Sequence, residues 1–113
     1  MFAAWLNALR RASGSARLWL LQFPAPAAQS LSDHAASEGV HIARLLSAPT
    51  ASRAFHLARI SLADLILDTS PYNGHTTTGD ATWMGVPVLT LPGNAMQARI
   101  AQGYAANAGC PFL

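Results

Sequence analysis

Residues 62–93, LADLILDTSPYNGHTTTGDATWMGVPVLTLPG, predict a strand, a glycine-containing loop, a helix and a second strand in quick succession. The apolar run at 65–67 is short and continuous, as expected for a strand that is buried on both faces of a parallel sheet. Residues 86–90, VPVLT, predict the strand that closes this β-loop-α-β unit. Asn73-Gly74 is a turn dipeptide, and Gly74 is expected to take the positive φ that a sharp reversal from strand to helix often needs.

The residues after this turn, His75, Thr76, Thr77 and Thr78, lie at the predicted start of the helix. The first backbone N–H groups of a helix have no intrahelical partner, and hydroxyls and an imidazole beside them favour an anion. A second interpretation stays open, because Thr77 and Asp80 fit the spacing of a capping box. The stretch has neither a Walker lysine nor a GxGxxG motif, so neither common phosphate fingerprint applies.

The composition describes a chain of 113 residues with 51% hydrophobic and only 11% charged residues. A self-contained domain usually has about a quarter of its residues charged. The low charge predicts that part of the surface is normally covered by another domain, and that the chain alone exposes an apolar patch and associates. The net charge of +2 is too small to indicate a nucleic-acid or membrane partner. Seven arginines and no lysine are typical of a high-GC bacterial genome.

Cysteine content and the N-terminal sequence bear on the compartment. Cys110 is the only cysteine, so no internal disulfide and no cysteine-built metal site is expected, and a reducing, cytoplasmic setting is the default. No apolar segment approaches the ~20 residues of a membrane span. Three arginines precede the apolar run at 18–21, but Gln22 and Pro24 interrupt it, so it is too short for the core of a signal peptide.

Predicted strands and helices alternate along the chain. Helices are expected at 1–12, 30–38, 52–59, 77–84 and 95–108, and strands at 17–23, 42–47, 65–67 and 86–91. This alternation predicts an α/β fold with a Rossmann-like parallel sheet and flanking helices. Ligands of such sheets bind beyond the carboxyl ends of the strands, where the loops after Phe23, at 48–53 and at 70–77 are expected to converge.

Some single residues are assigned from their place in these elements. Trp19 and Trp83 lie inside predicted elements and are therefore expected in the core. Asp68 directly follows a strand and is expected to anchor the turn or loop after it. Arg53, His56 and Arg59 are three residues apart and share one face of a short helix, which by spacing alone predicts a solvated basic face.

Motifs along nearly the whole chain occur in a specific combination. They are LWLL at 18–21, FP at 23–24, LAD at 62–64, LDT at 67–69, NGHTT at 73–77, Asp80, WMGVP at 83–87, TLPG at 90–93, ARIA at 98–101 and Gly109-Cys110. In this combination they resemble the catalytic region of the O-GlcNAc transferase family, the TPR-linked glycosyltransferases that include SPINDLY-like and bacterial members. The resemblance implies that residues 1–113 are part of the C-terminal, nucleotide-sugar-binding lobe of a GT-B glycosyltransferase.

The resemblance also implies a set of residues that bind a UDP-sugar. They are Ala51, Arg53, His56, Arg59, His75, Thr76, Thr77 and Asp80. Family members typically carry Lys-x-x-His-x-x-Arg where this chain has Arg53, His56 and Arg59, so Arg53 departs from the family's lysine. The histidine would pack on the uracil, which main-chain groups near Ala51 would also contact.

The remaining positions match the part of the family's site that holds the diphosphate and ribose. His75, Thr76 and Thr77 match the diphosphate-binding loop residue for residue, and donors there would stabilise charge on the departing UDP. Asp80 matches an acidic residue that approaches the ribose hydroxyls in relatives.

The function implied by this resemblance is the donor-binding part of an inverting transferase that moves N-acetylglucosamine from UDP to Ser/Thr hydroxyls of proteins. No metal or other cofactor and no catalytic residue within 1–113 is expected. The protein acceptor, the N-terminal catalytic lobe and the TPR repeats would be engaged through regions outside this chain, so the chain alone is expected to be inactive. Two alternatives remain: a non-catalytic nucleotide-binding or interaction module, and a truncated, inactive gene product.

Overall fold

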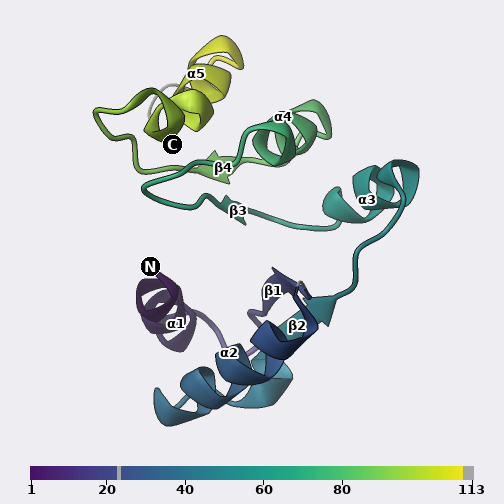
Figure 1. Ribbon diagram of the computed structural model, residues 1–113, viewed down its shortest axis with the longest axis vertical. Coiled ribbons are helices and arrows are strands. Elements are labelled where there is room, and N and C mark those ends of the chain that lie inside the picture. Colours follow the sequence, from purple (N-terminus) through teal and green to yellow (C-terminus); the bar gives the residue numbers. More distant parts are fainter. Residues whose placement is uncertain (23, 111–113) are drawn as a thin grey trace. The chain divides into compact units, whose positions relative to one another are not determined.

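A computed structural model of the chain describes residues 1–22 and 24–110 (Figure 1). The chain divides into two compact units, Met1–Ala51 and Ser52–Leu113. Each unit has one pair of parallel strands with helices beside it, which confirms the predicted α/β class. In the described residues the strands form two separate two-stranded sheets, β1-β2 and β3-β4, where a single sheet was expected. No helix within residues 1–22 and 24–110 is long and apolar enough to cross a membrane.

The first unit packs two helices with one strand pair. Its elements are α1 (Phe2–Arg11), β1 (Leu18–Leu21), α2 (Ala25–Ser37), the 3-10 turn η1 (Ile42–Arg44) and β2 (Leu45–Ala48). Strands β1 and β2 are parallel, with Leu18 opposite Leu45. Leu6 and Leu9 lie on one face of α1 and are buried together with Ala35 and Val40. The helical spacing of the apolar residues thus produces the core of this unit.

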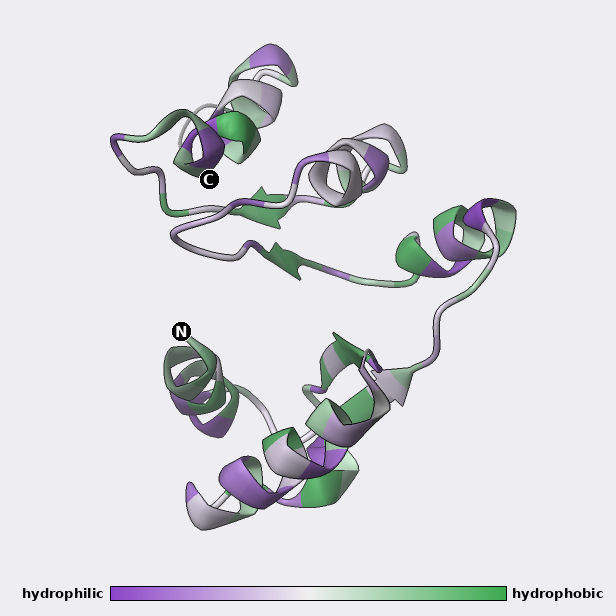
Figure 2. Ribbon diagram, viewed as in Figure 1, coloured by the Kyte–Doolittle hydropathy of each residue, from purple (hydrophilic) through white to green (hydrophobic). Residues whose placement is uncertain are grey.

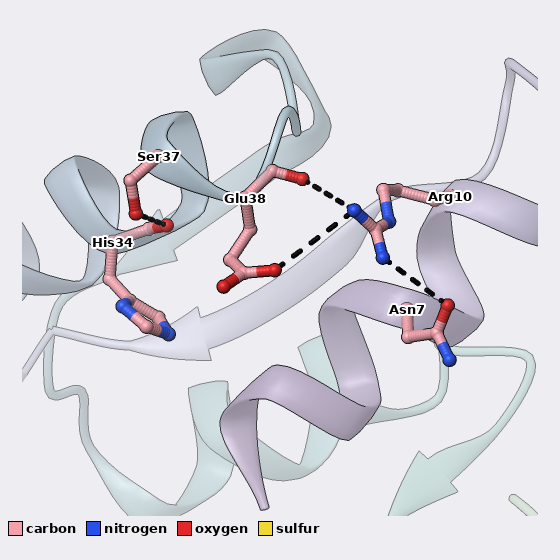
Figure 3. A network of polar contacts seen from close by, with 5 residues as sticks. All are labelled: Asn7, Arg10, His34, Ser37 and Glu38. Atoms are coloured by element: carbon pink, nitrogen blue, oxygen red, sulfur yellow. Dashed lines mark hydrogen bonds and ion pairs between the residues drawn. The ribbon is translucent and has the colours of Figure 1, made fainter.

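A polar network joins the end of α2 to α1 (Figure 3). The Arg10 guanidinium donates to the Glu38 carbonyl at 2.9 Å and to the Asn7 side-chain oxygen at 3.4 Å. It also lies 4.0 Å from the Glu38 carboxylate. All these side chains are solvent-accessible, so the network contributes little to the free energy of unfolding.

Helix α2 starts five residues before the predicted position at Ser30. Pro24 is its N-cap, and Pro26 lies in the first turn. Both prolines lie after the strand predicted at 17–23. They also begin the helix, because the N–H that proline lacks would have no intrahelical partner in the first turn. In addition, the fixed φ of proline is already helical.

The second unit contains residues 62–93. Its elements are α3 (Arg53–Ile60), β3 (Ile66–Leu67), α4 (Thr76–Trp83), β4 (Val88–Leu89), the 3-10 turn η2 (Met96–Ala98) and α5 (Ile100–Asn107). Strands β3 and β4 are parallel, with Ile66 opposite Val88, and both are hydrophobic (Figure 2). Helix α4 contacts α3, α5 and β4. The buried core is formed by Ile60, Ala81, Val86 and Val88.

Three expectations for this unit are corrected. Strand β3 is half-buried and Leu65 is exposed, so the strand is not buried on both faces. The helix expected at 95–108 is divided at Arg99, whose φ of −128° is outside the helical range, into η2 and α5. Trp83 is 85% exposed, and Trp19 is also exposed, so neither is a core residue.

Candidate functional site

A surface pocket of about 490 Å³ lies in the second unit, where α3, α4 and α5 meet. Its lining residues are Arg53, Leu57, His75, Thr76, Gly79, Asp80, Trp83 and Tyr104. Four of the eight residues predicted to bind a UDP-sugar are therefore brought together: Arg53, His75, Thr76 and Asp80. They come from segments more than twenty residues apart in the sequence.

The loop that leads into α4 is held by Asp68, at the end of β3. Its carboxylate accepts a hydrogen bond from the Gly74 N–H at 2.7 Å and another from the Thr90 hydroxyl, also at 2.7 Å. The prediction that Asp68 anchors the loop is confirmed. Asn73 is fully buried in the same loop, and its N–H donates to the Gln97 carbonyl at 2.9 Å.

Gly74 is needed for close approach and not for a left-handed backbone. Its φ is not positive, so the expectation of a positive-φ turn at this position is wrong. A Cβ at Gly74 would lie 2.6 Å from the Thr77 hydroxyl oxygen and 2.8 Å from that of Thr78. Only glycine lets the loop pass this close to the first turn of α4.

Helix α4 begins at Thr76, with His75 as its N-cap. The capping-box interpretation of Thr77 and Asp80 is wrong, because Thr77 already lies inside the helix and the Asp80 carboxylate binds Arg53. Among residues 1–22 and 24–110, no side chain makes a capping hydrogen bond at this helix start. The N–H groups of its first turn therefore remain the natural donors for an anion.

The ring of His75 stacks on Tyr72, with ring centroids 4.9 Å apart and planes inclined by 10°. Stacking holds the imidazole in one orientation at the start of α4. Its Nε2 atom is buried and has no hydrogen-bond partner within the described residues. A buried imidazole nitrogen without a partner is costly, so a hydrogen-bond partner from a ligand or solvent is expected there.

Arg53 and Asp80 form an ion pair at the pocket. The Arg53 guanidinium donates to both carboxylate oxygens, at 2.7 Å and 3.4 Å. The Asp80 side chain is 10% exposed and that of Arg53 is 66% exposed. The fork of the guanidinium suits both oxygens at once, which the single ammonium of a lysine does not.

The other four predicted residues do not line the pocket. Thr77 is exposed on α4, one residue beyond Thr76. His56 is half-buried on α3, and the Arg59 guanidinium lies 5.9 Å from the centre of the Phe55 ring. Ala51 belongs to the first unit. For all eight residues, inside and outside the pocket, involvement in nucleotide binding stays a prediction.

Sequence reasoning missed several residues of the site. Tyr72 and Tyr104 were not singled out, although Tyr104 forms part of the pocket wall and packs on Gly79. A Cβ at Gly79 would lie 3.0 Å from the Tyr104 hydroxyl, so the glycine makes room for the ring. The available signal was a glycine in the interior of a predicted helix, which usually has a packing or functional reason.

Comparison with known proteins identifies the family. The sequence profile of glycosyl transferase family 41 matches residues 1–113. The chain belongs to glycosyl transferase family 41. Among its relatives in this family is the probable UDP-N-acetylglucosamine--peptide N-acetylglucosaminyltransferase SEC of Arabidopsis thaliana, 44% identical over 97 residues. The UDP-N-acetylglucosamine--peptide N-acetylglucosaminyltransferase of Caenorhabditis elegans is 33% identical over 109 residues.

The similarity extends to the three-dimensional structure. A mutant O-GlcNAc transferase of Thermobaculum terrenum matches with a TM-score of 0.82 and 35% identity, over 97% of this chain and 22% of that one. The resemblance and the GT-B fold class inferred from the sequence are confirmed. The match to the Arabidopsis relative includes 86% of this family 41 chain but only 10% of the relative. The match to the Caenorhabditis relative includes 96% of this chain but only 9% of the relative.

Proposed function

We propose that this chain supplies the donor-nucleotide site of a family 41 glycosyltransferase, and that it binds the uridine diphosphate of UDP-N-acetylglucosamine. The observation that carries the proposal is the grouping of Arg53, His75, Thr76 and Asp80 around one pocket at the uncapped start of α4. The names of the relatives support the nucleotide sugar as donor and a peptide as acceptor.

Each group has a task in this proposal. The first turn of α4, with the Thr76 and Thr77 hydroxyls, donates to the diphosphate oxygens, and His75 adds its free ring nitrogen. Asp80 accepts from the ribose hydroxyls, and Arg53 holds the Asp80 carboxylate in place. His56 packs on the uracil, next to Arg59.

The chemical contribution is electrostatic. In the transfer, the bond between the anomeric carbon and the diphosphate oxygen breaks while a Ser/Thr hydroxyl oxygen of the acceptor attacks with inversion. The electron pair of the broken bond stays on the leaving UDP, whose negative charge grows. Donors already oriented at the start of α4 stabilise that charge without reorganising. The groups that deprotonate and orient the acceptor are assigned to other regions of the transferase, so no sugar transfer is expected from the 113-residue chain alone.

A cytoplasmic setting is part of the proposal.

The test is a calorimetric or NMR titration of the chain with UDP and with UDP-N-acetylglucosamine. Both are expected to bind at one site, and His75→Ala is expected to weaken UDP binding about tenfold, which corresponds to about 1.4 kcal/mol. His34→Ala is the matched control, because His34 is exposed on α2 in the other unit. The proposal fails if a chain shown to be folded by circular dichroism gives no UDP-dependent change, or if both histidine variants behave alike.

A further inference from the structure

We infer that Asp68 is a positioning residue whose buried carboxylate sets the loop between β3 and α4, so that the first turn of α4 presents its donors to a diphosphate. This inference rests on the proposed function and deepens it. Nothing in the family resemblance assigned Asp68 to the UDP-sugar site, and it does not line the pocket. It would act through the loop that it holds.

The geometry of Asp68 is that of a junction between three segments. The residue is only 9% exposed and follows β3 directly. Each carboxylate oxygen accepts one hydrogen bond of 2.7 Å, one from Gly74 at the entry to α4 and one from Thr90 at the end of β4. Hydrogen bonds to an ionised oxygen are about twice as strong as neutral ones. One side chain thus connects both strand ends to the helix start.

These bonds also decide which N–H groups remain for a ligand. The Gly74 N–H is used by Asp68, and the Asn73 N–H is used by the Gln97 carbonyl. The donors left for a diphosphate are therefore the N–H of His75 and those of the first turn of α4, from Thr76 onward. Asp68 orients that turn, because Gly74 lies only two residues before it and its Cβ position is already crowded by Thr77 and Thr78.

The chemistry of the junction allows a conservative replacement. In Asp68→Asn the amide oxygen can still accept from Gly74, while the amide nitrogen donates to the Thr90 oxygen, since a hydroxyl accepts as well as donates. Asp68→Ala loses both bonds. Thr90→Val has nearly the shape of threonine and loses only the bond to β4. These three variants separate the hydrogen-bonding role of Asp68 from its charge.

The experiment compares UDP with uridine in titrations of the wild type and these variants. Asp68→Ala is expected to lose at least tenfold in UDP affinity while uridine affinity stays within twofold, because only the diphosphate uses the loop. Asp68→Asn is expected to stay within about threefold of the wild type for both ligands, and Thr90→Val to lie between Asn and Ala. Equal losses for UDP and uridine, an unchanged Asp68→Ala, or an Asn variant as weak as Ala would each overturn the inference.

Amide hydrogen exchange of Gly74 provides a readout that needs no ligand. The Gly74 N–H is expected to be protected in the wild type and in Asp68→Asn, and to lose that protection in Asp68→Ala. If Asp68→Ala does not fold, Thr90→Val carries the comparison. An unprotected Gly74 amide in the wild type would overturn the inference, whereas a wild type that protects Gly74 but binds no UDP would refute the proposed function instead.

Discussion

The family resemblance implies a lysine where this chain has Arg53, and the geometry of Arg53 shows the consequence of the difference. A guanidinium can meet both oxygens of one carboxylate, and here it reaches those of Asp80 at 2.7 Å and 3.4 Å. The nearly buried Asp80 carboxylate is thereby satisfied by the protein itself. The family resemblance, and not local spacing, made both residues candidates, and their partnership spans 27 positions and appears only in the folded chain.

Removal of Arg53 is expected to destabilise the second unit slightly. Arg53→Ala leaves the Asp80 carboxylate without this partner, and because the arginine is mostly exposed, solvent limits the loss to about 1 kcal/mol in the free energy of unfolding. The free energy of unfolding of Arg53→Lys should lie between those of the wild type and Arg53→Ala, since lysine retains the charge but not the two-pronged hydrogen bonding of the guanidinium. Urea denaturation measures the effect. Arg11→Ala is the control, expected within about 0.5 kcal/mol of the wild type; equal losses at both positions would mean that the ion pair contributes nothing.

At the scale of elements, the start of α4 depends on close packing between a loop and a helix. The Asp68 carboxylate accepts a hydrogen bond from the loop at Gly74, and the Tyr72 ring of the loop stacks on His75. At Gly74 the loop passes close to the hydroxyls of Thr77 and Thr78. The turn dipeptide and the threonines predicted a loop followed by a helix to within one residue. The reason for the glycine was different from the one expected, because the crowding comes from residues that follow it in the helix.

Gly74→Ala is therefore expected to destabilise the chain by about 1–3 kcal/mol, the usual cost of overpacking. Thr78 is buried and has little freedom to move away from the new methyl group. Gly103→Ala, inside α5 with no atom near its Cβ position, is the matched control and should stabilise by about 0.5–1 kcal/mol. Thermal unfolding of both variants tests this. A Gly74→Ala variant as stable as Gly103→Ala would show that the loop relaxes freely. If crowding causes the loss, adding Thr78→Ala to Gly74→Ala should restore part of the lost stability.

At the scale of the whole molecule, many large apolar side chains remain exposed. Large apolar side chains of the second unit are exposed, among them Leu62, Trp83, Leu91 and Met96. Trp83 lies on α4 at the pocket, and Leu91 follows β4. This exposure agrees with the low charge content of the sequence.

The purified chain is expected to associate with itself as its concentration rises. Exposed apolar side chains that meet between copies are removed from water, and few charges oppose the contact. Sedimentation velocity over a range of concentrations measures the association. A variant with Leu62→Gln, Leu91→Gln and Met96→Gln should remain monomeric to higher concentration, whereas exchange of the exposed Gln102 for serine should change nothing. A wild type that stays monomeric throughout and unfolds cooperatively would contradict the expectation and indicate a self-sufficient domain.

Residues close together in the sequence determined the order of strands and helices, the loop at Asn73-Gly74 and the start of α4, because periodicity and turn chemistry are local. The combination of motifs also predicted the family. Tertiary structure alone decided which candidates share a pocket: Arg53 meets Asp80, whereas His56 and Arg59 on the same helix as Arg53 do not line it. It also placed Trp83 at the surface and joined Asp68 to Thr90, 22 positions away. Such partnerships depend on how separate elements pack, and a pattern of neighbouring residues carries no information about that packing.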